Sequence, residues 1–269
     1  MDKTSLGDRI KLYEAATDQF IIPHLPVVVR LDGRSFSTFT KGFNRPFDTD
    51  FREAMIEVAK YLVQETHAKI AYTQSDEITL IYSTNSPKQR VFFEGRVQKI
   101  CSVFAGLAAS RFLLEVQKRW SHKLEGSPLP TFDCRAFYTP NEIEAYNAIL
   151  WREQDATKNS IQMAARAEFT HGECKNLNTK QLQAKLLKER DINWNNYTSG
   201  EKRGTYIRKE KVERVLSSER LALIPEDKRP VGGKVMRNEI VIMDMPPIMK
   251  VDNAVDVIFR GENPRLRTG

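Results

Sequence analysis

The 269-residue chain is poor in the side chains that build disulfide frameworks and zinc sites, with three cysteines and four histidines. The cysteines are odd in number and widely spaced, which gives neither a disulfide framework nor a CxxC zinc pattern. The histidines are scattered in the same way, so a zinc site and a Cys–His nucleophile are both excluded. These residues are Cys101, Cys134, Cys174, His24, His67, His122 and His171.

Long apolar segments are also missing from the sequence. We find no run near the roughly 20 apolar residues that a membrane span requires, and residues 1–8 lack the apolar core of a secretory signal. No internal repeat or low-complexity tract is found. With 41% hydrophobic and 29% charged residues, the composition is that of an ordinary globular protein. We expect a folded cytoplasmic protein that has no membrane partner.

The formal net charge of +7 modestly favours an anionic partner. Residues 185–214 hold nine Lys or Arg against five acids, with Trp194, Tyr197 and Tyr206 interleaved. Aromatic rings among cations can stack on exposed bases while the cations contact phosphates. A solvated helix followed by a surface hairpin explains the same pattern equally well, so both interpretations stay open.

The order of expected elements predicts an α+β fold. Apolar runs indicate strands at residues 27–31, 70–73, 78–82 and 132–136, and helical spacing indicates helices near 51–62 and 92–112. This βαββαβ order is that of a palm-like, ferredoxin-type antiparallel sheet with helices on one face. We expect a catalytic palm domain at residues 1–138 and a C-terminal α+β extension at 139–269, which opens on a helix capped by Asn141.

Acidic residues lie at the ends of adjacent strands of the expected sheet. Asp32 follows the first strand, and Asp76 and Glu77 lie in the turn between the two central strands. The sheet order brings these acids to one edge, where carboxylates can bind a divalent metal for nucleotidyl transfer. Each motif alone is explained by a plain turn or hairpin tip, whereas together they favour a metal site.

Two motifs resemble the signatures of the tRNA(His) guanylyltransferase family, whose members add nucleotides to RNA in the 3′-to-5′ direction. These are residues 30–36, Arg-Leu-Asp-Gly-Arg-Ser-Phe, and residues 71–77, Ala-Tyr-Thr-Gln-Ser-Asp-Glu. The resemblance continues at Phe47-Asp48, on the second helix and at Trp151-Arg152. It is weaker at residues 192–196 and 202–205.

One departure from the family pattern indicates the branch. Members that add the extra guanosine to tRNA(His) carry His-Ile-Asn-Asn after the Trp-Arg pair, whereas this chain has Thr157-Lys158-Asn159-Ser160. That change is typical of the bacterial, archaeal and phage tRNA(His)-guanylyltransferase-like proteins, which resemble template-directed 5′-end repair enzymes. A second departure is Ser37, where the family's nucleotide loop often has His.

The resemblance implies roles for particular residues. Two Mg²⁺ ions would be bound by the carboxylates of Asp32 and Asp76 and the Gly33 carbonyl, with Glu77 as a further required acid. ATP or GTP would activate the RNA 5′-monophosphate, and nucleoside triphosphates would be the substrates. The implied nucleotide contacts are Asp32, Gly33, Arg34, Ser35, Phe36, Ser37, Ser75 and Asp76, then Arg45, Asp48, Arg96, Lys99 and Ser102 for a second triphosphate. Arg96 and Lys99 also fit a plain basic stripe on a helix.

The resemblance further implies that the second half contacts tRNA and assembles a homotetramer. The tRNA contacts expected from it are Arg152, Asn159, Lys188, Asn196, Lys202 and Arg203. Three alternatives remain: a true tRNA(His) guanylyltransferase adding a single guanosine, a palm-type cyclase or signalling-nucleotide synthase, and a non-catalytic RNA-binding protein. The missing Gly-Gly-Asp-Glu-Phe-type turn opposes a diguanylate cyclase, and the complete set of acids opposes loss of catalysis.

Overall fold

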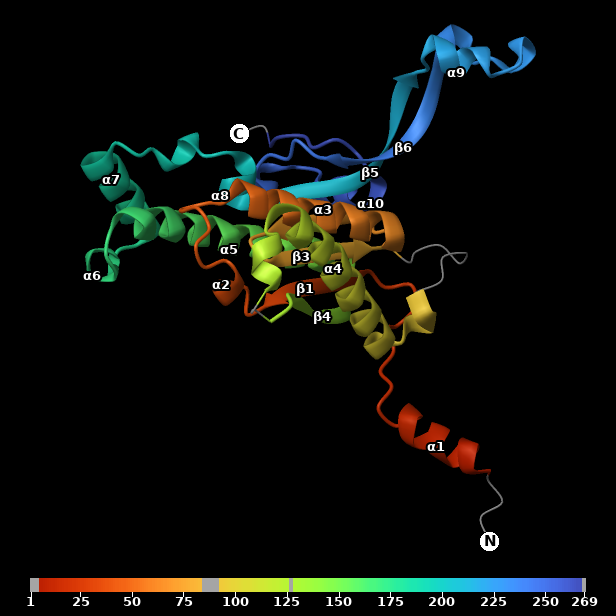
Figure 1. The fold of residues 1–269 in the computed structure, drawn as a ribbon, viewed down its shortest axis with the longest axis horizontal. Helices are drawn as coiled ribbons and strands as arrows, with labels where there is room; N and C mark the ends of the chain where they lie inside the picture. Colours follow the sequence, from red (N-terminus) through yellow and green to blue (C-terminus); the bar gives the residue numbers. More distant parts are fainter. Residues whose placement is uncertain (1–4, 84–91, 126–127, 268–269) are drawn as a thin grey trace.

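A computed structural model describes residues 5–83, 92–125 and 128–267 (Figure 1). One six-stranded antiparallel sheet has the order β4-β1-β3-β2-β5-β6. The strands are β1 (Val27–Arg34), β2 (Ile70–Gln74), β3 (Glu77–Tyr82), β4 (Thr131–Tyr138), β5 (Thr205–Val215) and β6 (Lys234–Ile242). The helices are α1 (Leu6–Ala15), α2 (Phe36–Phe39), α3 (Thr49–Thr66), α4 (Val97–Arg119), α5 (Glu142–Glu168), α6 (His171–Cys174), α7 (Thr179–Arg190), α8 (Ser199–Arg203), α9 (Ser218–Ala222) and α10 (Ala254–Arg260).

The first four strands confirm the predicted βαββαβ palm. In their order, β4-β1-β3-β2, each β–α–β crossover joins two parallel strands that have one antiparallel strand between them. Helices α3 and α4 pack on one face of this sheet. The alternating strand residues Val27, Val29 and Leu31 face α3 and α4 in the larger hydrophobic core. Val28, between them, faces the opposite side and a second core.

The second core is covered by elements from the C-terminal half. Helices α5 and α10 pack over Val28, Ile70 and Ile81 on the sheet face opposite α3 and α4. Strand β5 pairs with β2, so the sheet continues through the predicted boundary at residue 138. Helices therefore cover both faces of the complete sheet, although the palm's own two helices lie on one face as predicted.

Helix α4 differs from the expectation that no segment is apolar enough to cross a membrane. It is the one described helix that meets that test by length and composition. In the fold, α4 packs against α3 and β4, and Phe104, Phe112 and Val116 lie in the larger core. Core packing thus accounts for the buried apolar residues of α4.

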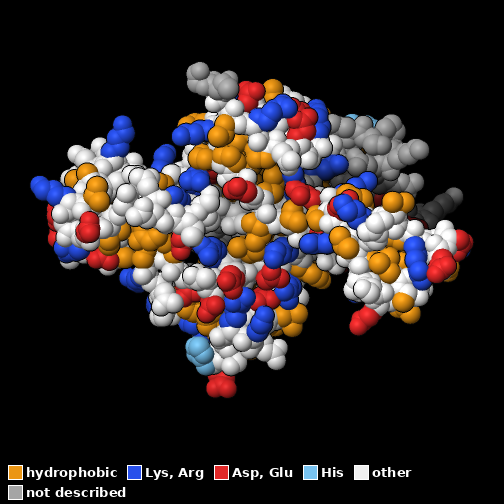
Figure 2. Space-filling view, turned by 90° about the horizontal axis from the view of Figure 1, so that it is seen from above, with side chains coloured by type: hydrophobic (Ala, Val, Ile, Leu, Met, Phe, Trp, Pro, Cys, Tyr) orange, Lys and Arg blue, Asp and Glu red, His pale blue; other side chains and the backbone are white. Residues whose placement is uncertain are grey.

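Two segments project from the body in opposite directions (Figure 1). Helix α1 has no buried residue, and the outer parts of β5 and β6 form a two-stranded arm that carries α9. On the face seen from above, basic and acidic side chains are interspersed (Figure 2). The net positive charge is therefore not gathered into a single patch on that face.

Candidate active site

An acidic row crosses three strands at one end of the sheet. Asp32 on β1 lies opposite Glu77 on β3 and opposite Asp133 on β4. Directly opposed residues of antiparallel strands share a face, and here it is the face covered by α5. Asp76 is adjacent in the β2–β3 turn, where the Gly33 N–H donates to the Asp76 carbonyl at 3.0 Å. The predicted convergence of Asp32, Asp76 and Glu77 is thus present.

Glu77 differs from the other acids because an arginine of α5 neutralises it. The Arg152 guanidinium donates to both carboxylate oxygens, with Nε to Oε1 at 2.7 Å and Nη2 to Oε2 at 2.6 Å. Burial raises the pKa of Glu77, and the contacts from Arg152 oppose that rise. The third nitrogen, Nη1, lies 3.3 Å from Asp155. Arg152, predicted to contact tRNA, therefore holds Glu77 in place in this structure.

Asp32 and Asp76 have no such cation. Within the described part of the chain neither carboxylate forms a salt bridge. Burial raises the pKa of Asp76, and the charge of Asp32 adds to this, while hydrogen bonds from its own N–H and from Ser75 oppose it. Two neighbouring carboxylates without a counter-charge repel each other, so this pair favours a bound cation.

The loop after β1 is shaped by glycine and phenylalanine. A Cβ on Gly33 would lie 2.5 Å from the Phe36 ring, so glycine permits the ring to pack inward. Phe36 is 2% exposed and contacts the Phe112 and Phe132 rings at 5.1 Å between centroids. Ser35 has a left-handed backbone, with φ of 59°. The Phe36 side chain therefore anchors the loop in the hydrophobic core. Any nucleotide contact at this loop must come from other residues, since the Phe36 ring is buried.

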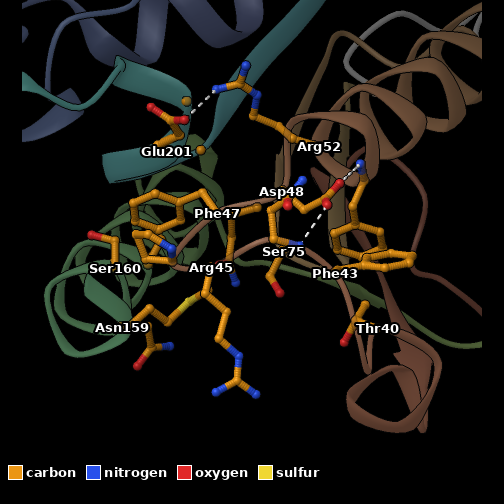
Figure 3. A pocket seen from close by; sticks show the side chains of 18 of the residues that line it. Thr40, Phe43, Arg45, Phe47, Asp48, Arg52, Ser75, Asn159, Ser160 and Glu201 are labelled. Carbon is orange, nitrogen blue, oxygen red and sulfur yellow. Dashed lines mark hydrogen bonds and ion pairs between the residues drawn. The ribbon is translucent and has the colours of Figure 1, made fainter. Parts of the chain in front are cut away.

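A cavity of about 260 Å³ lies beside the acids, between the α3 N-terminus, the β2–β3 turn, α5 and α8 (Figure 3). Thr40 and Phe43 form one wall, and Asn159 and Ser160 of α5 form the opposite one. Arg52 faces Glu201 across the rim, with Nη1 to Oε1 at 3.7 Å. The predicted nucleotide residues Ser37, Arg45, Asp48 and Ser75 all line this cavity.

Known proteins match both the sequence and the fold of this chain. A sequence profile of the family described as tRNAHis guanylyltransferase matches residues 7–140. Two solved structures of a bacterial tRNA(His) guanylyltransferase (Thg1)-like protein, one with ATP and one with GTP, give TM-scores of 0.77 and 0.72. They are 35% and 36% identical to this chain, matching 95% and 92% of it and 97% and 95% of their own lengths. The chain belongs to the tRNA(His) guanylyltransferase family.

A further relative in this family is a Drosophila melanogaster protein named probable tRNA(His) guanylyltransferase. It is 27% identical over 72% of this chain and 71% of its own length. Family membership makes this chain a nucleotidyltransferase, as its sequence motifs predicted. The match to Thg1-like proteins over nearly the whole chain also confirms the resemblance to that group.

The two residues near the start of α3 that were predicted to contact nucleotide, Arg45 and Asp48, differ in how they are held. Asp48 caps α3, since one carboxylate oxygen accepts from the Phe51 N–H at 2.8 Å and the other from the Asn44 N–H at 3.0 Å. Arg45 is exposed at the cavity. Arg45 can therefore contact a triphosphate directly, whereas Asp48 shapes the loop that presents it.

The residues predicted on α4 lie away from these acids within one chain. Arg96 occupies the N-cap position of α4 without a side-chain capping bond, and its backbone forms an isolated β-bridge with Phe20. Lys99 lies over the Phe93 ring at 5.3 Å. The neighbouring Phe92 packs on Tyr82, which pairs with Val27 at the far end of β1. Five residues, roughly 17 Å of strand, separate Val27 from Asp32. Arg96, Lys99 and Ser102 therefore form a separate exposed group.

The predicted tRNA contacts other than Arg152 are spread over several elements. Lys188 on α7 and Asn196 before α8 are exposed. Lys202 donates to the Asn195 carbonyl, and Arg203 donates to the Ser199 hydroxyl at 2.6 Å. Asn159 lines both the nucleotide cavity and the acidic site. Lys188, Asn196 and Asn159 are therefore the exposed members of this set, whereas Arg152, Lys202 and Arg203 are half-buried.

Of the two interpretations left open for residues 185–214, base stacking by Trp194 and Tyr206 is contradicted by the structure. Both side chains are buried, at 8% and 3% exposure. Tyr206 donates to Glu153 at 2.6 Å, and the Trp194 ring N–H donates to Ser160 at 3.2 Å. These aromatic residues join the C-terminal segment to α5. Burial of their apolar rings is more favourable than exposure of the rings to water.

Some residues at the acidic site were missed by the motif analysis. Gln162, Met163 and Arg166 of α5 line a cavity of about 370 Å³ together with Asp32 and Asp76. They follow Arg152 and Asn159 at helical spacing, so one face of α5 overlooks the acids. That periodicity is the signal that was available in the sequence.

Proposed function

We propose that this protein adds nucleotides to the 5′ end of RNA in the 3′-to-5′ direction, with a tRNA lacking its 5′ nucleotide as substrate and the opposite strand as template. The observation that carries the proposal is the uncompensated pair Asp32 and Asp76 beside a nucleotide-sized cavity. Support comes from the similar Thg1-like protein described in complex with ATP and with GTP.

The acidic site suits magnesium. Asp32 and Asp76 offer hard oxygen ligands, and the Gly33 carbonyl is adjacent. Among residues 5–83, 92–125 and 128–267, no group of three or more His, Cys, Asp or Glu converges on a metal position. Mg²⁺ often takes one or two carboxylates and completes its coordination with phosphates and water. Bound there, Mg²⁺ would supply charge stabilisation for phosphoryl transfer.

The chain's own groups divide the remaining work. Arg45 and the loop at Ser37 and Ser75 would hold a triphosphate in the cavity, so that its α-phosphate is turned toward the acids. In a first step, the RNA 5′-phosphate displaces pyrophosphate from ATP or GTP. In a second, the 3′-hydroxyl of an incoming triphosphate attacks that RNA phosphate and the activating monophosphate leaves. Orientation of these groups provides much of the catalysis.

The test incubates the protein with Mg²⁺, labelled nucleoside triphosphates and a tRNA missing its first 5′ nucleotide. We expect the RNA to grow at its 5′ end by the Watson–Crick complement of the opposite base. Asp32→Ala and Asp76→Ala should abolish growth while remaining folded, since losing a metal ligand forfeits several kcal/mol of transition-state stabilisation. Near-normal growth with either variant at saturating Mg²⁺ would refute the metal assignment.

A second RNA separates repair from tRNA(His) maturation. The replacement of His-Ile-Asn-Asn by residues 157–160 predicts that truncated tRNAs of any identity are extended. Extension of tRNA(His) alone, with guanosine opposite adenosine in preference to pairing, would contradict template direction and support a true guanylyltransferase. A homotetrameric assembly and a cytoplasmic location stay part of the proposal.

A further inference from the structure

The face of the sheet beneath α5 is banded by charge. The acidic row Asp133, Asp32 and Glu77 is followed, two residues inward on each strand, by the row Arg135, Arg30 and Thr79. The next row is apolar, with Phe137, Val28 and Ile81. Cations therefore lie directly beside the acids, on the same face.

A groove of about 350 Å³ lies between β4 and the first half of α5, over Arg30 and Thr79 of the second row and Val28 and Phe137 of the third. We name it the Trp151 groove; its lining includes Arg30, Thr79, Phe137, Asn147 and Trp151. Trp151 is 57% exposed although it belongs to α5, and Phe137 is 42% exposed. The Arg152 and Arg30 guanidiniums lie 4.6 and 5.8 Å from the Trp151 ring centroid. Open aromatic faces beside arginines are suited to nucleobases.

The groove also contains a buried polar group that no other group in the described chain satisfies. Thr79 is 1% exposed, and its hydroxyl has no hydrogen-bond partner. A buried hydroxyl without a partner is destabilising, so this one favours a polar ligand. Neither Arg30 nor Arg135 forms a salt bridge within the described residues, in contrast to Arg152. Arg30 and Thr79 therefore offer hydrogen-bond donors inside the groove, and Glu144 is the one acid among its lining residues. Arg135 lies outside this lining, exposed on β4 opposite Arg30, and adds a cation beside the groove.

Helix α5 orders three sites along its length. Trp151 faces the groove, Arg152 borders both the groove and the acids, and Asn159 borders both the acids and the nucleotide cavity. The acids consequently lie between the groove and the cavity. A transfer reaction brings two reactants to the metal site from different directions, and the cavity accounts for only one of them.

We propose that the Trp151 groove binds the 5′-terminal nucleotides of the RNA that is extended. The base lies against Trp151, and the backbone phosphate lies between Arg30 and Arg135, which directs the terminal phosphate to the acids. The proposal rests on the proposed function and identifies where its RNA substrate enters. It also explains why an exposed tryptophan and unpaired arginines are next to the catalytic row.

Binding of a 5′-monophosphorylated, single-stranded RNA, labelled at its 3′ end, tests the groove by fluorescence anisotropy. Trp151→Ala should weaken binding about tenfold, the size of one base–aromatic stack. Arg135→Met should lower the slope of log affinity against log salt by about 0.7, one phosphate contact. Matched controls are Arg237→Met, an exposed arginine on β6, and Tyr13→Ala, an exposed aromatic on α1. Both controls should bind like the wild type.

Intrinsic fluorescence gives a second measurement. Trp120 and Trp194 are each 8% exposed, so RNA stacking should quench mainly Trp151. Trp151→Phe should keep most of the affinity and lose the quench. Hairpins that differ only in whether the unpaired tail carries the 5′ or the 3′ end identify the strand. We expect Trp151→Ala to weaken the 5′-tailed hairpin more, and the reverse result overturns the proposal.

The outcomes separate this inference from the proposed function. If Trp151→Ala binds RNA with wild-type affinity, shows the same fluorescence quenching and still extends RNA, the groove is not the RNA site, and the proposed function is unaffected. If RNA quenches the fluorescence of the wild-type protein but the protein never extends RNA, the proposed function is contradicted and RNA binding at the groove is still supported. Nucleotide affinity should be the same in wild type and Trp151→Ala, which shows that the variant is folded.

Discussion

Replacement of Arg152 by methionine should destabilise the protein at neutral pH by exposing an uncompensated acid. Arg152 is 13% exposed and Glu77 is 7% exposed, and two contacts of 2.6 and 2.7 Å join them. At an effective dielectric constant of about 20, such a pair attracts by roughly 6 kcal/mol. Removal of one partner of a buried pair typically costs about 3–5 kcal/mol. Because Arg152 is partly exposed, we expect Arg152→Met to lower the free energy of unfolding by the smaller end of this range, about 3 kcal/mol.

The loss should depend on pH in a defined direction. Burial raises the pKa of Glu77 despite Arg152, so ionisation of Glu77 already opposes folding as the pH rises above its ordinary pKa. Without Arg152 that pKa rises further, and the penalty at neutral pH grows. Below the ordinary value of 4.5 Glu77 is protonated in both states, and the penalty disappears. The stability deficit of Arg152→Met should therefore shrink on acidification.

Urea unfolding of wild type and variant, at neutral pH and near pH 5, measures this deficit. Glu77→Gln/Arg152→Met should recover most of the lost stability, because neither position of the pair then carries a charge. Arg166→Met is the matched control, since this exposed arginine of α5 should change the free energy of unfolding by less than about 0.5 kcal/mol. A deficit equal at both pH values, or a double variant as unstable as Arg152→Met, would refute the reasoning.

Three other changes test separate parts of the structure. Asp48→Ala should cost about 1 kcal/mol in chemical denaturation, because it removes the cap of α3, and should raise the KM for nucleotide by displacing the cavity loop. Gly204→Ala should lower Tm by several degrees, since φ is +83° and a Cβ would lie 2.7 Å from the Thr73 carbonyl. Neutralising Arg96 and Lys99 should reduce extension of 5′-monophosphorylated RNA more than of 5′-triphosphorylated RNA; equal losses would assign them to RNA binding or helix stability.

Local patterns predicted the palm well because each one reports a physical requirement that acts over a few residues. Alternation in β1 and the Asn141 cap of α5, whose side chain accepts from the Glu144 N–H, are examples. Contacts between distant segments left no such local signal. The pairing of Glu77 with Arg152 and the burial of Tyr206 against Glu153 arise only when α5 crosses the sheet. In the sequence alone, the charged and aromatic residues at those positions therefore matched the pattern of an RNA-binding surface.

The pairing of β5 with β2 has a consequence for synthesis of the chain. A ribosome that has released only the first 138 residues leaves β2 as an open edge strand, with Val28, Ile70 and Ile81 uncovered. Open edges and bare apolar faces invite aggregation. We expect the palm to become stably folded only after α5 and β5 have been synthesised. Catalytic competence and solubility should then appear together, near the end of synthesis. A truncated protein ending near residue 138 should then be insoluble, although it contains Asp32, Asp76 and Glu77.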